Sequence, residues 1–298
     1  MSASAARWLQ QRQDQVPSAL DWLAELERQR LAGLPFAKRQ RDFLLGRWTA
    51  KRALAAWLPT AIPELWAAFG PSLSELTVRA ADDGAPEAWL GGERLPVTLS
   101  LSHSGGHAVA ALRRHLPGSA QGSAAVPPRW LGADCERVEP RSELLVADFF
   151  TAEEAAQVAA CAPPLRDLWI TLLWSAKESA LKATRQGLRE DARRAQVRLP
   201  DATSPTARGR WQPLQVELTG APDALDGWWQ VREDLVITIV GLGLTAPPSR
   251  LVAEAPDAPD APEVAEDEAP EASDAPNAPE APLKRSGKSQ HSPRPAEK

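Results

Sequence analysis

Residues 165–184 read LRDLWITLLWSAKESALKAT, and this stretch decides how the second half of the chain is built. Residues 168–173 of this stretch are apolar nearly all round, which predicts a buried helix. A helix turns by about 100° per residue, so Trp174, Glu178 and Lys182 form one stripe with Lys177 on its flank. Charged groups on a buried helix need partners or a function. The alternative is an ordinary Glu–Lys surface pair, which contributes roughly a few tenths of a kcal/mol.

Further strands and helices are predicted on both sides of this helix. Residues 129–134 predict a strand, and residues 142–149 predict a helix. Another helix is predicted after Thr151, because Glu154 three residues later completes a capping box. Apolar and β-branched runs then predict strands at 214–218, 228–232 and 235–240.

The first half of the chain follows a similar order of helices and strands. Helical periodicity predicts helices at 18–31 and 36–58. In Val97–Leu101 the apolar residues alternate strictly, as in a strand with one buried face. Strands are predicted at 73–79, 96–102 and 108–113. The sequence therefore predicts an α+β fold with two similar halves rather than alternating βαβ units.

The composition predicts where these halves begin and end. We expect the regions to be a flexible N-terminus (1–17), an N-terminal α+β half (18–116), a linker loop (117–128), a C-terminal α+β half (129–245) and a tail (246–298). The tail repeats Ala-Pro-Asp and Ala-Pro-Glu. Such a segment cannot bury enough apolar surface to offset its ordering entropy, so we expect it to be disordered.

Charge and cysteine content exclude several classes of protein. The net charge is −5, but residues 251–298 hold 11 acidic and 5 basic side chains, so the other 250 residues are near +1. A nearly neutral body argues against general nucleic-acid binding. Two cysteines do not suggest a disulfide framework, and no apolar run approaches the roughly 18 residues of a membrane span. The N-terminus lacks the apolar core of a signal peptide, so we expect a cytoplasmic protein.

The segment Gly132-Ala133-Asp134-Cys135-Glu136 places two carboxylates next to each other. Residues two apart on a strand share a face, so Asp134 and Glu136 project together while Cys135 points the other way. Neighbouring carboxylates repel each other unless a cation or a proton lies between them. Oxygen ligands of this kind suit Mg²⁺. The alternative is a solvated pair at a strand end.

A third polar group, SLSHSGGH at 100–107, follows the alternating strand. The hydroxyl of Ser102, the imidazole of His103 and the two glycines could contact a phosphate through side chains and backbone. The alternative is an ordinary turn. A basic helical region could add further cations to a phosphate site. The alternative is an ordinary solvated helix face. Its basic residues are Lys38, Arg39, Arg41, Arg47, Lys51 and Arg52.

In this order along the chain, the motifs resemble the signature of the Sfp-type 4'-phosphopantetheinyl transferases. Residues 132–136 match the family's Gly-x-Asp-x-Glu motif, and residues 174–182 match its Trp-x-x-Lys-Glu-x-x-x-Lys motif. The Ser-His-Ser at 102–104 also matches, and residues 43–51 resemble the family's N-terminal basic helix. The resemblance covers roughly residues 20–245. Two motifs in the right order and spacing are far more specific than either one alone.

The resemblance implies a fold and an activity. The two α+β halves would be related by a pseudo-twofold axis, with the active site in the cleft between them. The protein would be a magnesium-dependent transferase that moves 4'-phosphopantetheine from coenzyme A to a serine of an acyl or peptidyl carrier protein, releasing 3',5'-ADP. This holo-ACP synthase activity serves fatty-acid, polyketide or nonribosomal peptide biosynthesis. A cytoplasmic monomer that binds neither nucleic acid nor membrane is expected.

The resemblance also assigns roles to residues. Asp134, Glu136 and Glu178 would ligate Mg²⁺. Glu178 and Lys182 would be catalytic, with Glu178 a candidate general base for the serine proton. The residues expected to contact coenzyme A are Arg47, Lys51, Ser102, His103, Lys177 and Lys182.

The chain departs from the family pattern at two loops. Ser100 stands where the family often has Asn, and Arg185-Gln186-Gly187 replaces a Gly-Lys-Gly. Two other functions fit some of these residues. One is a non-catalytic module that binds coenzyme A or a carrier protein. The other is a Mg²⁺-dependent phosphohydrolase, which needs only water as acceptor.

Overall fold

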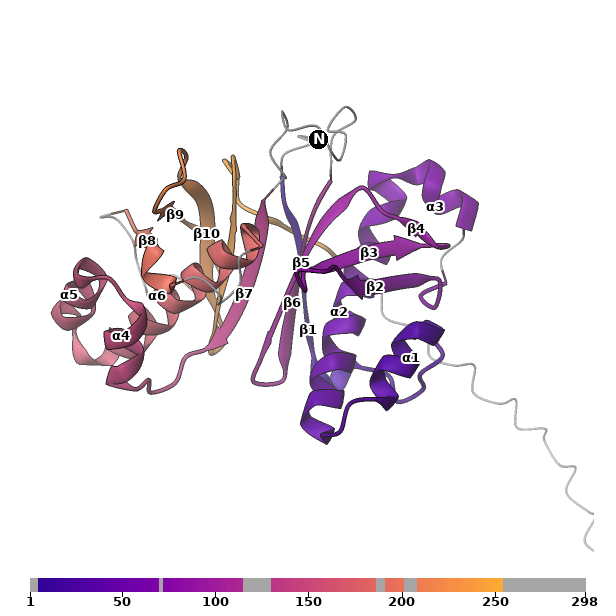
Figure 1. Cartoon of the computed structure of the whole chain (residues 1–298), viewed down its shortest axis with the longest axis horizontal. Coiled ribbons are helices and arrows are strands. Elements are labelled where there is room, and N and C mark those ends of the chain that lie inside the picture. The colour runs from indigo at the N-terminus through magenta and orange to yellow at the C-terminus, as the bar shows by residue number, and fades with distance from the viewer. Residues whose placement is uncertain (1–4, 70–71, 115–129, 186–190, 201–207, 254–298) are drawn as a thin grey trace, which may run out of the picture. The chain divides into compact units, whose positions relative to one another are not determined.

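The two longest helices, α2 (Ala37–Ala61) and α6 (Pro163–Ala183), each pack against a β-sheet (Figure 1). This computed structural model describes residues 5–69, 72–114, 130–185, 191–200 and 208–253. Residues 1–255 form one compact unit. Because strands of this unit run mainly antiparallel and its helices are grouped beside the sheets, the predicted α+β class is confirmed.

The first sheet has the order β12-β1-β6-β5. Its strands are β12 (Ser249–Arg250), β1 (Arg7–Arg12), β6 (His107–Arg114) and β5 (Val97–Ser104). A small sheet beside it has the order β2-β3-β4, formed by β2 (Leu76–Ala80), β3 (Pro86–Leu90) and β4 (Glu93–Arg94). Helices α1 (Glu25–Ala32) and α3 (Pro63–Phe69) contact α2 on this side of the molecule (Figure 1).

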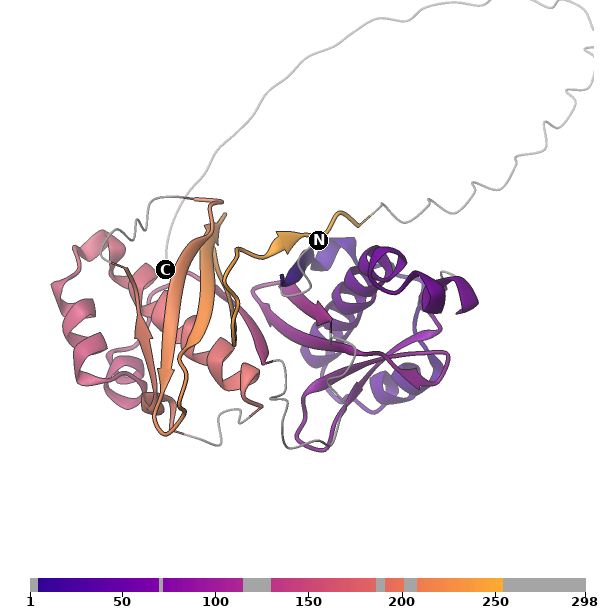
Figure 2. The ribbon, with the colours of Figure 1, turned by 90° about the horizontal axis from the view of Figure 1, so that it is seen from above.

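The second sheet has the order β7-β11-β10-β9-β8 and is antiparallel throughout. Its strands are β7 (Leu131–Arg137), β11 (Leu235–Gly241), β10 (Leu225–Arg232), β9 (Gln212–Leu218) and β8 (Ala195–Arg198). Helix α6 lies on one face of this sheet, and α4 (Glu143–Phe149) and α5 (Ala152–Ala160) lie beside it (Figures 1 and 2).

The two sheets pack face to face between the helices, which gives helix, sheet, sheet and helix layers (Figure 2). Strand β6 is buried on both faces by this layering. Ala110 and Leu112 pack in the core beneath α2, whereas Val109 and Ala111 on the other face pack against the second sheet. A strand buried on both faces is apolar throughout, as residues 108–112 are. Strands β5 and β6 of the first sheet thereby lie against β7 of the second.

Most predicted elements are confirmed, and most of their ends move by only a few residues. The capping box of Thr151 and Glu154 begins α5 as predicted. The helix predicted at 18–31 begins only at Glu25, where the backbone nitrogen of the N-cap residue Ala24 donates to the side chain of Glu27. The expected linker at 117–128 lies outside the described residues, as does the part of the expected tail (246–298) from residue 254 onward. The expectation of disorder is wrong for the start of that tail, because Ser249–Arg250 form β12, which pairs with β1.

The expectation of a flexible terminus over residues 1–17 is wrong for residues 7–12. These residues form β1, which pairs along its whole length with β6. The segment RWLQQR has only two apolar residues, which is too weak a pattern to predict a strand. Both are buried, Trp8 between the sheets and Leu9 in the core beneath α2, so each anchors a different face of β1.

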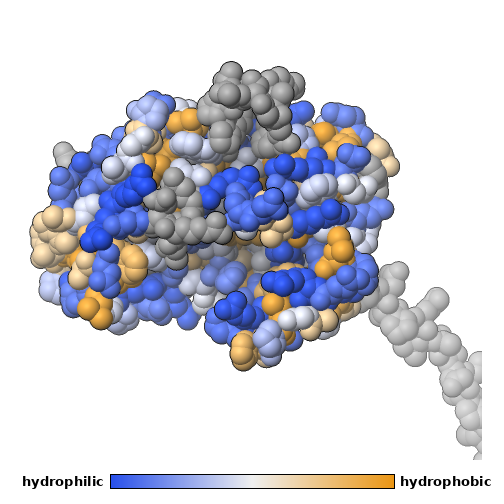
Figure 3. Space-filling view, in the orientation of Figure 1, coloured by the Kyte–Doolittle hydropathy of each residue, from blue (hydrophilic) through white to orange (hydrophobic). Residues whose placement is uncertain are grey.

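The apolar residues of the described chain are concentrated inside. The face in Figure 3 is largely hydrophilic, with hydrophobic residues in small scattered groups. None of the helices in the described ranges combines the length and the apolar character needed to cross a bilayer.

Candidate functional site

Asp134 of β7 is the centre of the polar cluster between the two sheets and α6. Its side chain is 2% exposed, and its Oδ1 accepts hydrogen bonds from Lys182 Nζ at 2.6 Å and Ser102 Oγ at 2.7 Å. Its Oδ2 is buried and has no hydrogen-bond partner among the described residues. A buried carboxylate oxygen without a partner is costly, so this atom is suited to receive a cation.

Close packing of α6 on β7 brings Lys182 and Asp134 together. A Cβ atom at Gly132 would lie 1.8 Å from the carbonyl oxygen of Ser179 and 2.6 Å from the backbone nitrogen of Ala183. Only glycine therefore allows this approach, which explains the first residue of the Gly-x-Asp-x-Glu motif. Thr238 of β11 fixes the same helix, because its hydroxyl lies 2.7 Å from the hydroxyl of Ser179.

Three serines of β5 line the cluster from the first sheet. Ser100, Ser102 and Ser104 share one face of the strand, and each contacts β7. The hydroxyl of Ser100 accepts from the backbone nitrogen of Ala133, so Ser100 closes a contact between the sheets. Serines at every second position, 100, 102 and 104, are the signal that could have predicted this row.

Glu136 is the second carboxylate of β7 and lies on the same side as Asp134. Its Oε2 accepts hydrogen bonds from Arg141 at 3.0 Å and from Ser104 at 3.3 Å. Burial, together with the nearby charge of Asp134, raises the pKa of Glu136 above its ordinary value. Cys135 between them is fully buried in the core, as the strand alternation predicts. Arg141 was not predicted from the sequence.

Glu178 lies one helical turn before Lys182 on α6 and is half-buried. Burial raises its pKa, Lys182 opposes this effect, and the charges of Asp134 and Glu136 raise the pKa further. For Lys182, burial would lower the pKa, but the charges of Asp134 and Glu178 raise it above the ordinary value. The three carboxylates therefore interact electrostatically around one ammonium group.

The carboxylates of Asp134, Glu136 and Glu178 do not form a compact set of metal ligands in this structure. Within the described ranges, the one group of His, Cys, Asp or Glu with ligand atoms all within 4.8 Å of one another is His107, Glu233 and Asp234. Instead, Asp134 forms an ion pair with Lys182, and Glu136 forms one with Arg141. The unpartnered Oδ2 of Asp134 and the raised pKa of the other two acids nevertheless fit a bound Mg²⁺.

His103 follows Ser102 on β5 but faces the opposite way, because successive side chains alternate across a strand. The imidazole is exposed, and Asp42, Lys182 and Lys38 all contribute to its electrostatic surroundings. Ser102 is thus in direct contact with the acidic cluster, whereas no hydrogen bond among the described residues joins His103 to a carboxylate of the cluster.

Two lysines expected to contact coenzyme A are instead fully buried, and this corrects the expectation. Lys177 forms an ion pair with Glu154 at 2.8 Å and donates to the carbonyl oxygens of Ala192 and Ala195. Lys51 pairs with Glu27 at 2.5 Å. Burial lowers the pKa of both lysines, although the acidic partner of each opposes the effect. Neither ammonium has an exposed surface on which to hold a phosphate.

Arg47, one turn before Lys51 on α2, is partly buried. Its Nε lies 3.6 Å from Glu27, its side chain is 19% exposed, and its guanidinium lies over the ring of Phe43. The Glu27 carboxylate therefore has two cationic neighbours from α2.

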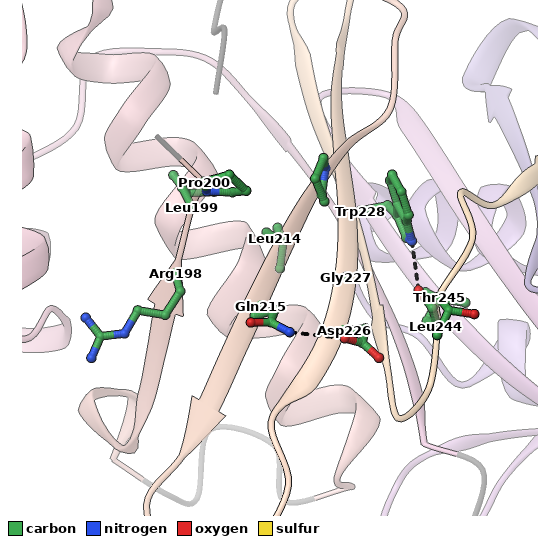
Figure 4. A pocket seen from close by; sticks show the side chains of 11 residues that line it. Arg198, Leu199, Pro200, Leu214, Gln215, Asp226, Gly227, Trp228, Leu244 and Thr245 are labelled. Carbon is green, nitrogen blue, oxygen red and sulfur yellow. Dashed lines mark hydrogen bonds between the residues drawn. The ribbon is translucent and has the colours of Figure 1, made fainter. Parts of the chain in front are cut away.

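A pocket of about 550 Å³ lies elsewhere, on the second sheet (Figure 4). Trp228 and Asp226 of β10 line it beside Leu214 and Gln215 of β9. The indole of Trp228 donates to the carbonyl oxygen of Leu244, and Gln215 donates to Asp226 (Figure 4). No residue predicted from the motifs lines this pocket.

Comparisons with known proteins show a similarity over part of the chain. Residues 131–240, from β7 to β11, match the family model described as "4'-phosphopantetheinyl transferase superfamily". The resemblance is confirmed at the level of the superfamily over this segment, which holds all three predicted metal ligands. Over this segment the chain is similar to enzymes of the 4'-phosphopantetheinyl transferase class.

Solved structures of holo-ACP synthases align with part of the chain. One is a holo-(acyl-carrier-protein) synthase from Bacillus anthracis in complex with CoA (3',5'-ADP), with 29% identity over 37% of this chain and 93% of that chain, at a TM-score of 0.29. Another is the ACPS–CoA complex of Chronobacterium ammoniagenes, with 20% identity over 38% of this chain and 98% of that chain, at a TM-score of 0.28. A search of curated proteins found no significant match.

Proposed function

We propose that this enzyme transfers the 4'-phosphopantetheine group of coenzyme A to a serine of an acyl or peptidyl carrier protein. The reaction requires Mg²⁺ and releases 3',5'-ADP. The observation that carries the proposal is the buried Asp134, with one oxygen bound by Lys182 and Ser102 and the other without a partner. Its position within the Gly-x-Asp-x-Glu motif of the matched segment supports the same conclusion.

Asp134, Glu136 and Glu178 would hold the ion. When bound, Mg²⁺ neutralises charge on the diphosphate and polarises its phosphoryl oxygens. The protein's own part is mainly positioning, because phosphoryl transfer needs little covalent chemistry from side chains. Lys182 supplies a fixed positive charge beside these acids, and Ser102 orients Asp134. Arg47, Ser102 and His103 remain the proposed coenzyme A contacts besides Lys182.

The proton of the carrier serine needs an acceptor. As the serine oxygen forms its bond to the β-phosphorus, the bond from that phosphorus to the oxygen of 3',5'-ADP breaks, and the proton passes to Glu178. Burial and neighbouring acids raise the pKa of Glu178, which makes its carboxylate a stronger base than an ordinary glutamate. The motif that contains Glu178 also places it one turn from Lys182, which can offset charge on the leaving group.

The proposed architecture has two similar halves around a pseudo-twofold axis, with the site in the cleft between them. Matched connections support it. Strand β1 pairs with β6 and β6 with β5, while β7 pairs with β11 and β11 with β10. Each first strand is followed along the chain by helices that include one long helix, α2 or α6. The proposed halves are residues 18–116, to which β1 is added, and residues 129–245. The polar cluster lies where β5 meets β7.

A cytoplasmic monomer that binds coenzyme A and carrier proteins, but neither nucleic acid nor membranes, completes the proposal. Transfer is tested by incubating the protein with Mg²⁺, coenzyme A and a panel of apo carrier proteins, followed by intact-mass spectrometry. The expected result is a carrier protein heavier by one phosphopantetheine group, with an equal amount of 3',5'-ADP. Release of 3',5'-ADP without a carrier protein would identify a phosphohydrolase. Binding of coenzyme A with no release would identify a non-catalytic module.

A further inference from the structure

The buried ion pair of Glu154 and Lys177 joins four elements of the C-terminal half. The carboxylate of Glu154 accepts a hydrogen bond from the backbone nitrogen of Thr151 at 2.9 Å, which closes the first turn of α5. It accepts another from the backbone nitrogen of Val197 in β8, also at 2.9 Å. Lys177 of α6 reaches Glu154 at 2.8 Å and donates to carbonyl oxygens at 192 and 195. Both side chains are 0% exposed. The pair thus joins α5, α6, the turn at 192–194 and β8.

The N-terminal half contains the same arrangement. The carboxylate of Glu27 accepts a hydrogen bond from the backbone nitrogen of Ala24, which closes the first turn of α1. It accepts another from the backbone nitrogen of Val78 in β2. Lys51 of α2 reaches Glu27 at 2.5 Å and donates to the carbonyl oxygen of Trp22 at 2.8 Å. Each lysine also lies near an aromatic ring, Trp22 in one half and Phe150 in the other, at 5.7 and 5.9 Å from the ring centroids.

The two lysines occupy matching positions in a short repeat. Residues 48–51 read WTAK, and residues 174–177 read WSAK. The residue after the lysine differs, since Arg52 follows in α2 and Glu178 follows in α6. We call each buried Glu–Lys pair, Glu154–Lys177 and Glu27–Lys51, a clamp. The first clamp therefore lies beside a proposed metal ligand, and the second lies beside a cation.

A buried ion pair is weak support for stability by itself, because desolvation of both charges offsets their attraction. Its effect here is geometric. Each residue of a helix is rotated by about 100° from the last, so fixing the direction of Lys177 also fixes the directions of Glu178 and Lys182. The Thr238 contacts hold α6 against β11, and the Lys177 contacts hold it against α5 and β8. Together they set the rotation of α6 about its own axis.

We infer that Lys177 and Glu154 are positioning residues, which hold α6 in the rotation that aims Glu178 at Asp134 and Glu136. This inference rests on the proposed metal site. The lysine of the WSAK segment acts through the helix and does not touch coenzyme A. The Glu27–Lys51 pair is a clamp of the same kind that positions no metal ligand.

The test compares Lys177→Met with Lys51→Met in the full-length protein. Mn²⁺ affinity is measured by electron paramagnetic resonance without coenzyme A, and thermal unfolding is recorded for each variant. Both variants are expected to lose thermal stability. Only Lys177→Met is expected to bind Mn²⁺ more weakly, by roughly 10-fold, as is typical when a group that orients a metal ligand is lost. The double variant Glu154→Gln/Lys177→Met leaves no unpaired charge and is used if the single variant does not fold.

Three outcomes would overturn the inference, and they can be told apart. Unchanged Mn²⁺ affinity in a destabilised Lys177→Met variant would show that the clamp does not position Glu178. Equal weakening in Lys177→Met and Lys51→Met would show a general loss of structure. Absence of Mn²⁺ binding in the unmodified protein would remove the proposed metal site, and the inference with it.

Discussion

The ammonium group of Lys182 lies 2.6 Å from Oδ1 of Asp134, although the two residues are 48 positions apart in sequence. The contact joins the last turn of α6 to the middle of β7 and leaves Oδ2 of the same carboxylate without a partner. One side of Asp134 is therefore neutralised by the protein, and the other side is left for a cation.

Asp134→Asn is expected to remove transfer while the fold is kept. The amide cannot supply a negative charge to the ion, so transfer should fall by roughly a hundredfold or more. Mg²⁺ should raise the melting temperature of the unmodified protein, since a ligand that binds only the folded state stabilises it, and should not raise that of the variant. Asp226→Asn, in the pocket of Figure 4, is the control and should behave as the unmodified protein. Retained transfer by Asp134→Asn would contradict the metal assignment.

Glu178→Gln separates two roles of one residue. As a general base, Glu178 is required for proton removal, so transfer should fall by about 10²–10⁴-fold. As a metal ligand, it is also required for tight ion binding. Mn²⁺ titration of the variant distinguishes the two, because weakened binding indicates a ligand, and unchanged binding with lost transfer indicates a base. Full activity in the variant would exclude both roles.

The metal-free protein should lose stability as the pH rises through the range in which Glu136 and Glu178 ionise. The pKa of each is raised in the folded state, so the folded protein holds protons that the unfolded chain has lost. Stability is therefore fully retained below the ordinary carboxyl pKa and falls as the pH passes from that value to the raised one. Glu178→Gln cannot lose this proton and should melt at a higher temperature than the unmodified protein at neutral pH.

The same comparison at acid pH provides the control. Below the ordinary carboxyl pKa both states of the unmodified protein are protonated, so the advantage of Glu178→Gln should disappear. Melting curves recorded in chelator over a pH series measure this. A melting temperature difference that does not change with pH would show that the raised pKa of Glu178 has no effect on folding.

Gly132→Ala should damage both stability and transfer. The added methyl group would meet the Ser179 carbonyl oxygen at 1.8 Å, so α6 must move away from β7, at a cost of about 1–3 kcal/mol. This movement separates Lys182 from Asp134. Gly46→Ala is the matched control, because nothing lies within 4 Å of the new Cβ and the site is inside α2. It should stabilise the protein by about 0.4–1 kcal/mol, as measured by denaturant unfolding.

The motifs were predictable from the sequence because they depend on local spacing. Alternation along a strand placed Asp134 and Glu136 together, and helical periodicity placed Glu178 one turn from Lys182. The same rules could not show that Lys51 and Lys177 are buried. Spacing gives the relative direction of a side chain on its own helix, whereas the partners Glu27 and Glu154 come from other elements.

The sequence by itself determined most of the elements and the motifs: the α+β class, the strand that carries two acids, the helix that carries Glu178 and Lys182, and the match to a transferase superfamily. Only the tertiary structure decided which charges meet. Asp134 meets Lys182 and Ser102, while Lys177 turns into the interior. The reason is physical, since patterns along the chain record local periodicity, whereas ion pairs depend on how distant helices and strands pack against one another.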